Sequence, residues 1–216
     1  MKTIVILTLI GFLNSCSQAP GELDLALSTS SSSENCYSLK GSHLSTASDL
    51  SYITLPSGFD LTGFNSTGVT FSNINISNTK GLSVQMLNNA NSTLRDIILP
   101  AGFDMTGFNA SGKKLINIDL SNTTNLNPTS FNGATELENV TLPPNYNLTG
   151  LVTTGMVLED MDFSNTSALT IQMLNDATLS GDIKLPDGFD VTGLDLTGAI
   201  ISTDFTSTVG LTIGIL

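Results

Sequence analysis

The sequence contains no tryptophan, one histidine, one arginine and two cysteines among its 216 residues. The single histidine, His43, cannot supply a Ser-His-Asp triad or a His-rich metal site, because both need a convergent set of side chains. The lack of tryptophan removes a side chain well suited to stack on a sugar ring in a glycosidase cleft. We therefore expect a protein that is not an enzyme and that uses no cofactor.

Positive charge is also scarce, with 7 Lys and Arg against 19 Asp and Glu and a formal net charge of −12. A surface of this sign repels nucleic acid and anionic lipid headgroups. We therefore expect no nucleic-acid partner. Charged residues make up only 12% of the chain, so Asn, Ser, Thr and Gly must form most of the polar surface. This composition is typical of extracellular β proteins and repeat proteins.

The N-terminus has the pattern of an export signal. Lys2 precedes an apolar run over residues 4–13 that is too short to span a bilayer as a helix, so we predict a signal peptide over residues 1–15. The run ends in Leu13-Asn14-Ser15-Cys16, which resembles the lipobox of bacterial lipoproteins. The resemblance implies cleavage before Cys16, lipidation of its thiol and tethering in the cell envelope, at the outer membrane or the cell surface. An ordinary signal peptide cut nearby is the alternative.

The polar segment over residues 16–48 has serine at five of the six positions 28–33. Segments of this kind bury too little apolar surface to offset the entropy of ordering. We predict a lipid-anchored flexible linker that runs into the start of an N-terminal cap. With Cys16 acylated or removed, Cys36 has no partner for a disulfide.

The rest of the chain, residues 49–216, is repetitive. Leu-Pro pairs begin at Leu55, Leu99, Leu142 and Leu185, 43 or 44 residues apart. Each period has two similar halves that share the pattern apolar-x-x-apolar-x-apolar, so the unit is 20–23 residues long. We attribute the eight Asn-x-Ser/Thr sequences in this region to the composition of the repeat.

The alternation at the end of this pattern predicts a short strand with one buried face. Strands stacked about 4.8 Å apart pair their backbones and bury their apolar side chains together. We therefore predict a mainly β fold, a β-solenoid of seven to eight coils, with Pro and Gly at corners such as Pro100, Gly102 and Gly107. The inward side chains of one coil are expected to be Leu115, Ile118, Leu120, Leu126, Phe131 and Ala134.

The segment Phe131-Asn-Gly-Ala-Thr-Glu-Leu-Glu-Asn-Val-Thr-Leu-Pro143 resembles the leucine-rich repeats of bacterial surface antigens. This resemblance implies a right-handed, leucine-rich-repeat-like solenoid used for adhesion or ligand binding. The unit is slightly short for that family, and Ser180 replaces the first leucine of one strand. The half that begins Phe59-Asp-Leu-Thr-Gly63 is instead similar to pentapeptide repeats, which wind a four-sided right-handed helix, although its five-residue phase fails from about Gly81 onward.

Polar residues recur at two positions of the strand pattern. The first column comprises Asn73, Asp96, Asn117, Asn139, Asp160 and Asp182, and the second, two residues further on, comprises Asn75, Ile98, Asp119, Thr141, Asp162 and Lys184. In-register stacking would place the two columns side by side on one exposed face, which is the predicted binding face. Glu159, Asp160, Asp162 and Asp182 could together ligate calcium. The alternative, which we adopt, is an amide ladder with acids for solubility and no metal.

We therefore expect a non-enzymatic, surface-exposed repeat protein whose strand face binds a host or envelope protein or a glycan. A structural envelope protein that associates end to end with copies of itself is the alternative, because residues 211–216 carry apolar side chains and no charge. A pentapeptide-like acidic mimic of nucleic acid is a third hypothesis.

Overall fold

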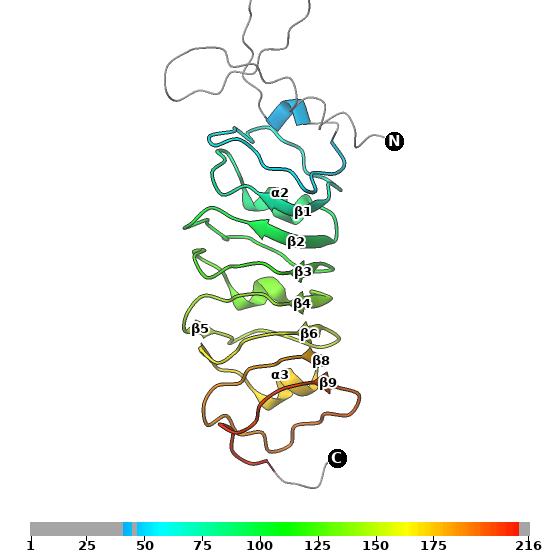
Figure 1. Ribbon diagram of the computed structural model, residues 1–216, viewed down its shortest axis with the longest axis vertical. Helices are drawn as coiled ribbons and strands as arrows, with labels where there is room; N and C mark the ends of the chain where they lie inside the picture. Colours follow the sequence, from blue (N-terminus) through cyan, green and yellow to red (C-terminus); the bar gives the residue numbers. More distant parts are fainter. Residues whose placement is uncertain (1–40, 45–46, 212–216) are drawn as a thin grey trace, which may run out of the picture.

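The computed structural model describes residues 41–44 and 47–211, and their fold is mainly β. The predicted signal peptide, Cys16, Cys36 and residues 212–216 lie outside the described residues. Seven strands form one parallel sheet, and two further strands pair in a second sheet. Figure 1 shows that the chain runs from one end of the molecule to the other as a stack of layers.

The elements are short and recur in a regular order. The main sheet contains, from one end to the other, β1 (Phe71–Asn75), β2 (Thr93–Ile98), β3 (Lys114–Ile116), β4 (Glu136–Glu138), β6 (Val157–Glu159), β8 (Thr178–Gly181) and β9 (Ile200–Ile201). The second sheet pairs β5 (Tyr146–Asn147) with β7 (Thr166–Ser167). The helical elements are η1 (Gly41–Leu44), α2 (Val84–Asn89), η2 (Pro128–Phe131) and α3 (Ile171–Asn175). The spatial order of the main sheet is the order of the sequence, so each layer lies on the one before it.

Neighbouring strands of the main sheet pair through equivalent positions of the repeat. Phe71 is opposite Leu94, Leu94 is opposite Leu115, and Leu115 is opposite Leu137. The repeat unit of 20–23 residues is thus the offset between paired strands. This register places the first apolar residue of each strand in a continuous row.

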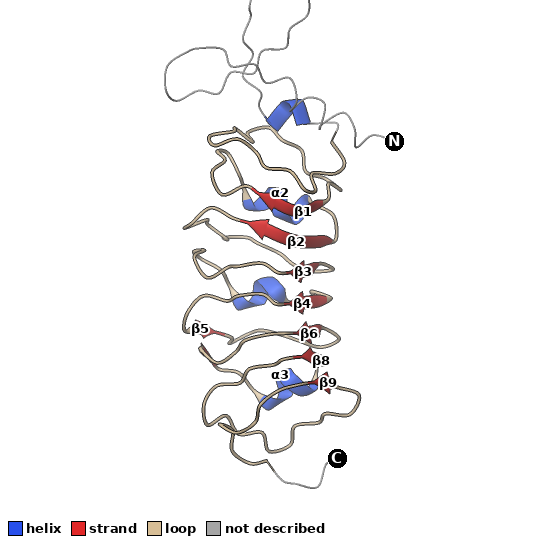
Figure 2. Ribbon diagram, in the orientation of Figure 1, coloured by secondary structure: helices blue, strands red, loops and turns tan. Residues whose placement is uncertain are grey.

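The layers are of two alternating kinds. In one kind, left-handed residues recur every five positions, as at Gly102, Gly107, Gly112 and Asn117, with φ of 71°, 80°, 71° and 53°. Glycine and asparagine occupy these bends because they reach positive φ at the lowest steric cost. In the other kind, part of the layer is a short helix, which is α2, η2 or α3 in successive examples (Figure 2).

Apolar side chains fill the interior of the stack. Of the predicted inward residues, Leu126 packs against the core and five are buried: Leu115, Ile118, Leu120, Phe131 and Ala134. Full burial of one large apolar side chain stabilises a fold by roughly 1.5 to 3 kcal/mol. Two buried polar atoms, the Tyr146 hydroxyl and Ser66 Oγ, have no hydrogen-bond partner within the described residues.

The described chain joins the stack from Gly41 onward. The Gly41 N–H donates to the Asp60 carbonyl at 2.6 Å, and Leu44 and Ala47 pack against the core. These residues thus lie against the first layer of the stack. None of the helices in residues 41–44 and 47–211 is long and apolar enough to cross a bilayer.

Candidate binding clefts

The first column owes its residue types to backbone conformation. Asn73, Asp96, Asn117, Asn139 and Asp160 all have φ between 48° and 53°. Asn and Asp are strongly enriched in this left-handed region, whereas most other side chains are disfavoured there. Each of these residues therefore forms a bend in or directly after a strand of the main sheet. Their side chains are half-buried or exposed at the bend.

The second column forms turns that are closed by its own side chains. Asn75 Oδ1 accepts hydrogen bonds from the Ser77 N–H at 3.0 Å and from Ser77 Oγ at 2.7 Å. The Asp162 carboxylate accepts the same pair from Ser164, at 2.9 and 2.6 Å, and Asp119 accepts the Ser121 N–H at 2.8 Å. These are Asx turns, in which a short Asn or Asp side chain replaces a backbone acceptor. Each turn uses one side-chain oxygen, and the other polar atom of the side chain takes no part in the turn.

Asp182 is not a member of the first column, and that prediction was wrong. Leu158 pairs with Leu179 in the main sheet, which brings Gly181 opposite Asp160 and makes Asp182 an additional residue. Gly181 has a φ of 68°, as its place in the column requires. The Asp182 N–H donates to Asp160 Oδ1 at 2.8 Å. The prediction failed because one inserted residue shifts the apparent pattern, so that Ser180 rather than Leu179 was aligned with the first leucine.

Two clefts follow one another along the face that carries the columns. The N-terminal cleft has a volume of about 680 Å³, and the C-terminal cleft has a volume of about 740 Å³. The N-terminal cleft contains five predicted face residues: Asn73, Asn75, Asp96, Asn117 and Asp119. The C-terminal cleft contains the other four: Asn139, Asp160, Asp162 and Asp182. The structure thus brings all nine predicted residues to two neighbouring clefts. Asp182 lines the C-terminal cleft although it is not a member of the column.

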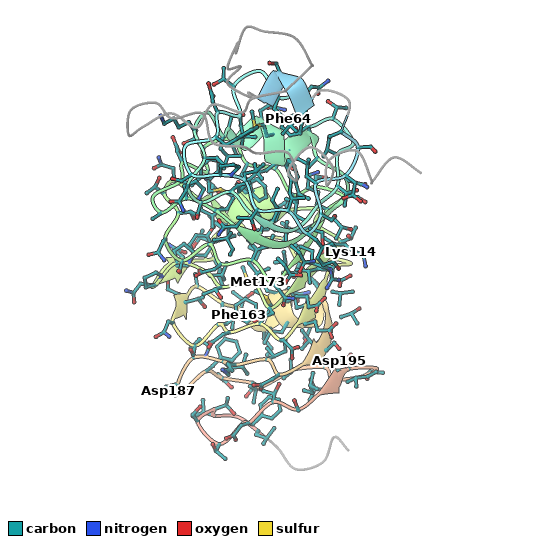
Figure 3. All side chains as sticks on the ribbon, turned by 45° about the horizontal axis from the view of Figure 1, so that its top comes forward. Phe64, Lys114, Phe163, Met173, Asp187 and Asp195 are labelled. Atoms are coloured by element: carbon teal, nitrogen blue, oxygen red, sulfur yellow. The ribbon has the colours of Figure 1, made fainter. Side chains whose placement is uncertain are left out.

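The clefts are equivalent sites of the long repeat. Each includes one Leu-Pro corner, Leu99-Pro100 in the N-terminal cleft and Leu142-Pro143 in the C-terminal cleft. The face extends from the strands toward these corners. In Figure 3, Lys114 of β3 and Asp187, which follows the next Leu-Pro corner, lie on opposite sides of the stack. A period of 43 residues therefore produces a repeated recess as well as a repeated core.

Part of the first column forms an amide ladder. Asn139 Nδ2 donates to Asn117 Oδ1 across neighbouring layers at 2.9 Å, and this contact lies between the two clefts. Asn73 Nδ2 donates to Ser72 Oγ at 3.0 Å within its own layer. These bonds hold the amide planes in place and leave further donor and acceptor positions toward the clefts.

The electrostatic environment near the C-terminal cleft is acidic. Burial opposes ionisation of Asp162, but hydrogen bonds from Ser164 and the charge of Lys184, 3.6 Å away, hold its pKa below the ordinary value. In the main sheet, burial raises the pKa of Glu138; the charge of Arg95 opposes that rise, and the charges of Glu159 and Glu136 add to it. An anionic ligand is therefore disfavoured at this end of the face.

The carboxylates do not form a metal site in the described part of the chain. No group of three or more His, Cys, Asp or Glu side chains in residues 41–44 and 47–211 is arranged to hold a metal ion. Asp160 and Asp162 each use one oxygen to accept backbone hydrogen bonds. The calcium arrangement with Glu159 and Asp182 is therefore not supported by the geometry.

A set of asparagines that was not predicted from the sequence joins the layers. The Nδ2 groups of Asn88, Asn132 and Asn175 donate to the carbonyls of Gly107, Gly150 and Gly193 at 2.9, 3.1 and 2.9 Å. Their Oδ1 atoms accept the N–H groups of Asn109, Val152 and Asp195 at 2.9, 2.8 and 2.8 Å. Each amide thus replaces a pair of ladder hydrogen bonds between two layers. The available signal was an asparagine directly after an inward apolar residue, recurring every 43 or 44 residues.

Comparison of the chain with family models, with curated proteins and with solved structures finds no match in any of the three. The geometry of the two clefts is therefore the basis for assigning a function.

Proposed function

We propose that this chain is a non-enzymatic, surface-exposed repeat protein that binds a protein or a glycan in its two clefts. The observation that carries the proposal is the recurrence of the same recess at equivalent positions of the long repeat. If these Asn and Asp residues only formed bends and Asx turns, no recess beside them would be required. Concave, partly apolar sites with a few oriented polar groups are the usual form of a ligand site.

Exposed apolar surface in the N-terminal cleft supports this proposal. Ile98 is 56% exposed, although it lies between polar residues in the second column. Pro100 and Ala101 line the same cleft. A ligand that covers Ile98 would remove apolar area from water and would also meet the polar atoms of the columns.

We further propose that the layers wind as a right-handed β-solenoid of seven to eight coils. Parallel pairing of consecutive strands at offsets of 20–23 residues supports the winding. Connections between parallel strands of one sheet are right-handed in about 98% of cases. The single strand face with short helices fits a leucine-rich-repeat-like winding. The five-residue spacing of left-handed residues in alternate layers fits a pentapeptide-like one.

The location proposed for this function is the cell envelope, with Cys16 as the lipid anchor. The support is the lipobox-like sequence at residues 13–16, which is followed by a polar linker. Replacing Cys16 with alanine should move the protein from the membrane fraction to the soluble fraction. Unchanged membrane association of that variant would contradict the anchor.

Self-association is a second candidate function, because apolar side chains are exposed in the last described layer. Ile200, Val209 and Leu211 are 80%, 52% and 57% exposed. End-to-end contact between copies would bury them. This function predicts association of the full chain at micromolar concentration in sedimentation velocity, and Ile200→Lys should abolish it. A strictly monomeric wild type would eliminate it.

The binding function can be tested with substitutions that fill one cleft at a time. Ile98→Lys and Thr141→Lys place a lysine in the second column of the N-terminal and C-terminal cleft, respectively. Lysine is compatible with this column, because Lys184 occupies it opposite Asp162. Val152→Lys is the matched control, since Val152 is 53% exposed and lies outside both clefts.

The full chain and these variants would be screened against a glycan array and against purified mucin, fibronectin and laminin. We expect at least one probe to bind the wild type, and we expect one cleft variant to bind it at least tenfold more weakly while the control binds normally. Binding that is insensitive to both cleft variants, or no binding of any probe, would overturn the proposal.

A further inference from the structure

Tyr52 has an unusual place at the N-terminal end of the first column. Its N–H donates to the Ser72 carbonyl at 3.0 Å, so Tyr52 lies one layer before Asn73. Its φ is 59°, close to the 48° to 53° of the Asn and Asp residues of the column. Its side chain is 81% exposed. The column therefore begins with an aromatic ring that extends into solvent.

Neither packing nor backbone preference explains a tyrosine at this position. A bulky side chain in the left-handed region is an outlier, and the other column positions carry Asn, Asp or Gly. The exposed ring gains little from burial, and asparagine would keep the backbone hydrogen bond to Ser72 at lower conformational cost. Unfavourable backbone conformations of this kind cluster at ligand sites. The tyrosine side chain is thus the feature that needs an explanation.

The neighbours of Tyr52 along the face are polar groups of the N-terminal cleft. Asn73 uses Nδ2 within its layer, and Asn75 uses Oδ1 in its Asx turn. Among the described contacts, Asn73 Oδ1 and Asn75 Nδ2 keep one acceptor and one donor available for a ligand. Asp96 and Asp119, which lie further along the stack, provide carboxylate oxygens in the same cleft.

We propose that Tyr52 is the stacking residue of a carbohydrate subsite at the N-terminal end of this cleft. One face of a pyranose ring is a patch of C–H groups that can cover an aromatic ring, while its hydroxyls exchange hydrogen bonds with amides and carboxylates. The acidic groups exclude an anionic sugar, so the ligand is a neutral oligosaccharide. A quaternary ammonium ligand fits less well, because it favours a cage of several rings, and Tyr52 lies beside a cleft whose lining adds no second ring.

This inference rests on the proposed binding function and deepens it for one of the two clefts. The composition of the chain provides a direct probe, because it has no tryptophan and only three tyrosines. In the full chain carrying Tyr37→Phe and Tyr146→Phe, Tyr52 is the single source of tyrosine emission. Maltohexaose, cellohexaose and chitohexaose would be titrated against it, with tetramethylammonium as the cationic probe.

We expect one of the three oligosaccharides to change the Tyr52 emission in a saturable manner. In calorimetry, Tyr52→Asn should bind that sugar at least tenfold more weakly, whereas Tyr52→Phe should stay within about threefold of the parent. The melting temperature of Tyr52→Asn should equal or exceed that of the parent, because asparagine suits the left-handed backbone. A loss of binding without a loss of stability separates recognition from folding.

Three results would overturn the inference. These are no response to any of the three sugars, unchanged sugar affinity in Tyr52→Asn, or saturation by tetramethylammonium in place of sugar. If the full chain still binds a probe that Thr141→Lys abolishes, the proposed binding function stands and the Tyr52 subsite alone is rejected. If no cleft variant alters any binding, the proposed function is rejected as well.

Discussion

Replacing Asn132 with alanine tests whether side-chain amides join the layers of this protein. The substitution removes the hydrogen bond from Asn132 Nδ2 to the Gly150 carbonyl and the one from the Val152 N–H to Asn132 Oδ1. A typical hydrogen bond contributes about 0.5 to 1.5 kcal/mol net to stability. Gly150 and Val152 are exposed, so water can replace part of the loss. We expect the free energy of unfolding to fall by about 1 to 2 kcal/mol.

Urea unfolding followed by circular dichroism would measure this loss, and hydrogen exchange would locate it. Because a stack of repeats can open locally, the Val152 amide should exchange faster even where global unfolding changes little. Asn122→Ala is the matched control, since Asn122 is exposed and its amide donates only to the adjacent Ser121, at 3.1 Å. Equal stability losses for Asn132→Ala and Asn122→Ala, with unchanged exchange at Val152, would refute the role of the amide.

Three further predictions concern stability. Leu120→Ala should lower the free energy of unfolding in urea by about 2 to 5 kcal/mol, because Leu120 is buried. Asn117→Gly should lower it far less, because glycine also suits a φ of 53°. Similar losses for the two variants would contradict a conformational role for Asn117. Tyr146→Phe should leave the melting temperature unchanged or raise it, because it removes a buried hydroxyl without a partner; a clear drop would indicate that the hydroxyl is satisfied. Burial lowers the pKa of the Lys113 amine, whose Nζ donates to the Ala90 carbonyl at 2.9 Å. In alkaline solution the unfolded chain then binds more protons than the folded chain, so the free energy of unfolding should rise with pH between the lowered pKa and the ordinary value of 10.5, and Lys113→Met should abolish that rise.

The repeat and its core could be read from the sequence because they depend on local spacing. The alternation Ile118-x-Leu120 selects one buried face of a short segment, and a period of 43 or 44 residues requires equivalent segments to stack. Parallel pairing of Leu94 with Leu115 and burial of Phe131 follow from these two facts. Positive φ at Gly102 and Gly107 was also foreseeable, since glycine at a recurrent corner indicates a bend.

Several Asn-x-Ser/Thr sequences show how one pattern can have a conformational cause. Asn65, Asn75, Asn109 and Asn147 each accept the N–H two residues further on, as Asp104 and Asp190 do in equivalent turns. Asn and Asp are interchangeable there because either side chain can accept this hydrogen bond. The sequence indicated that the motif belongs to the repeat. The Asx turn that accounts for it is known only from the backbone conformation and its hydrogen bonds.

The arrangement of the surface residues and the position of the clefts follow only from the tertiary structure. The alignment of Gly181 with Asp160 depends on which leucine enters the sheet, and pairing across layers settles that choice. The bridging role of Asn132 depends on a partner 18 to 20 residues away, and the left-handed conformation of Tyr52 depends on the layer that pairs with it. The two clefts arise where columns from several layers meet a Leu-Pro corner. Spacing along one chain determines which side chains point inward, whereas the recesses between layers depend on how successive layers are placed against one another.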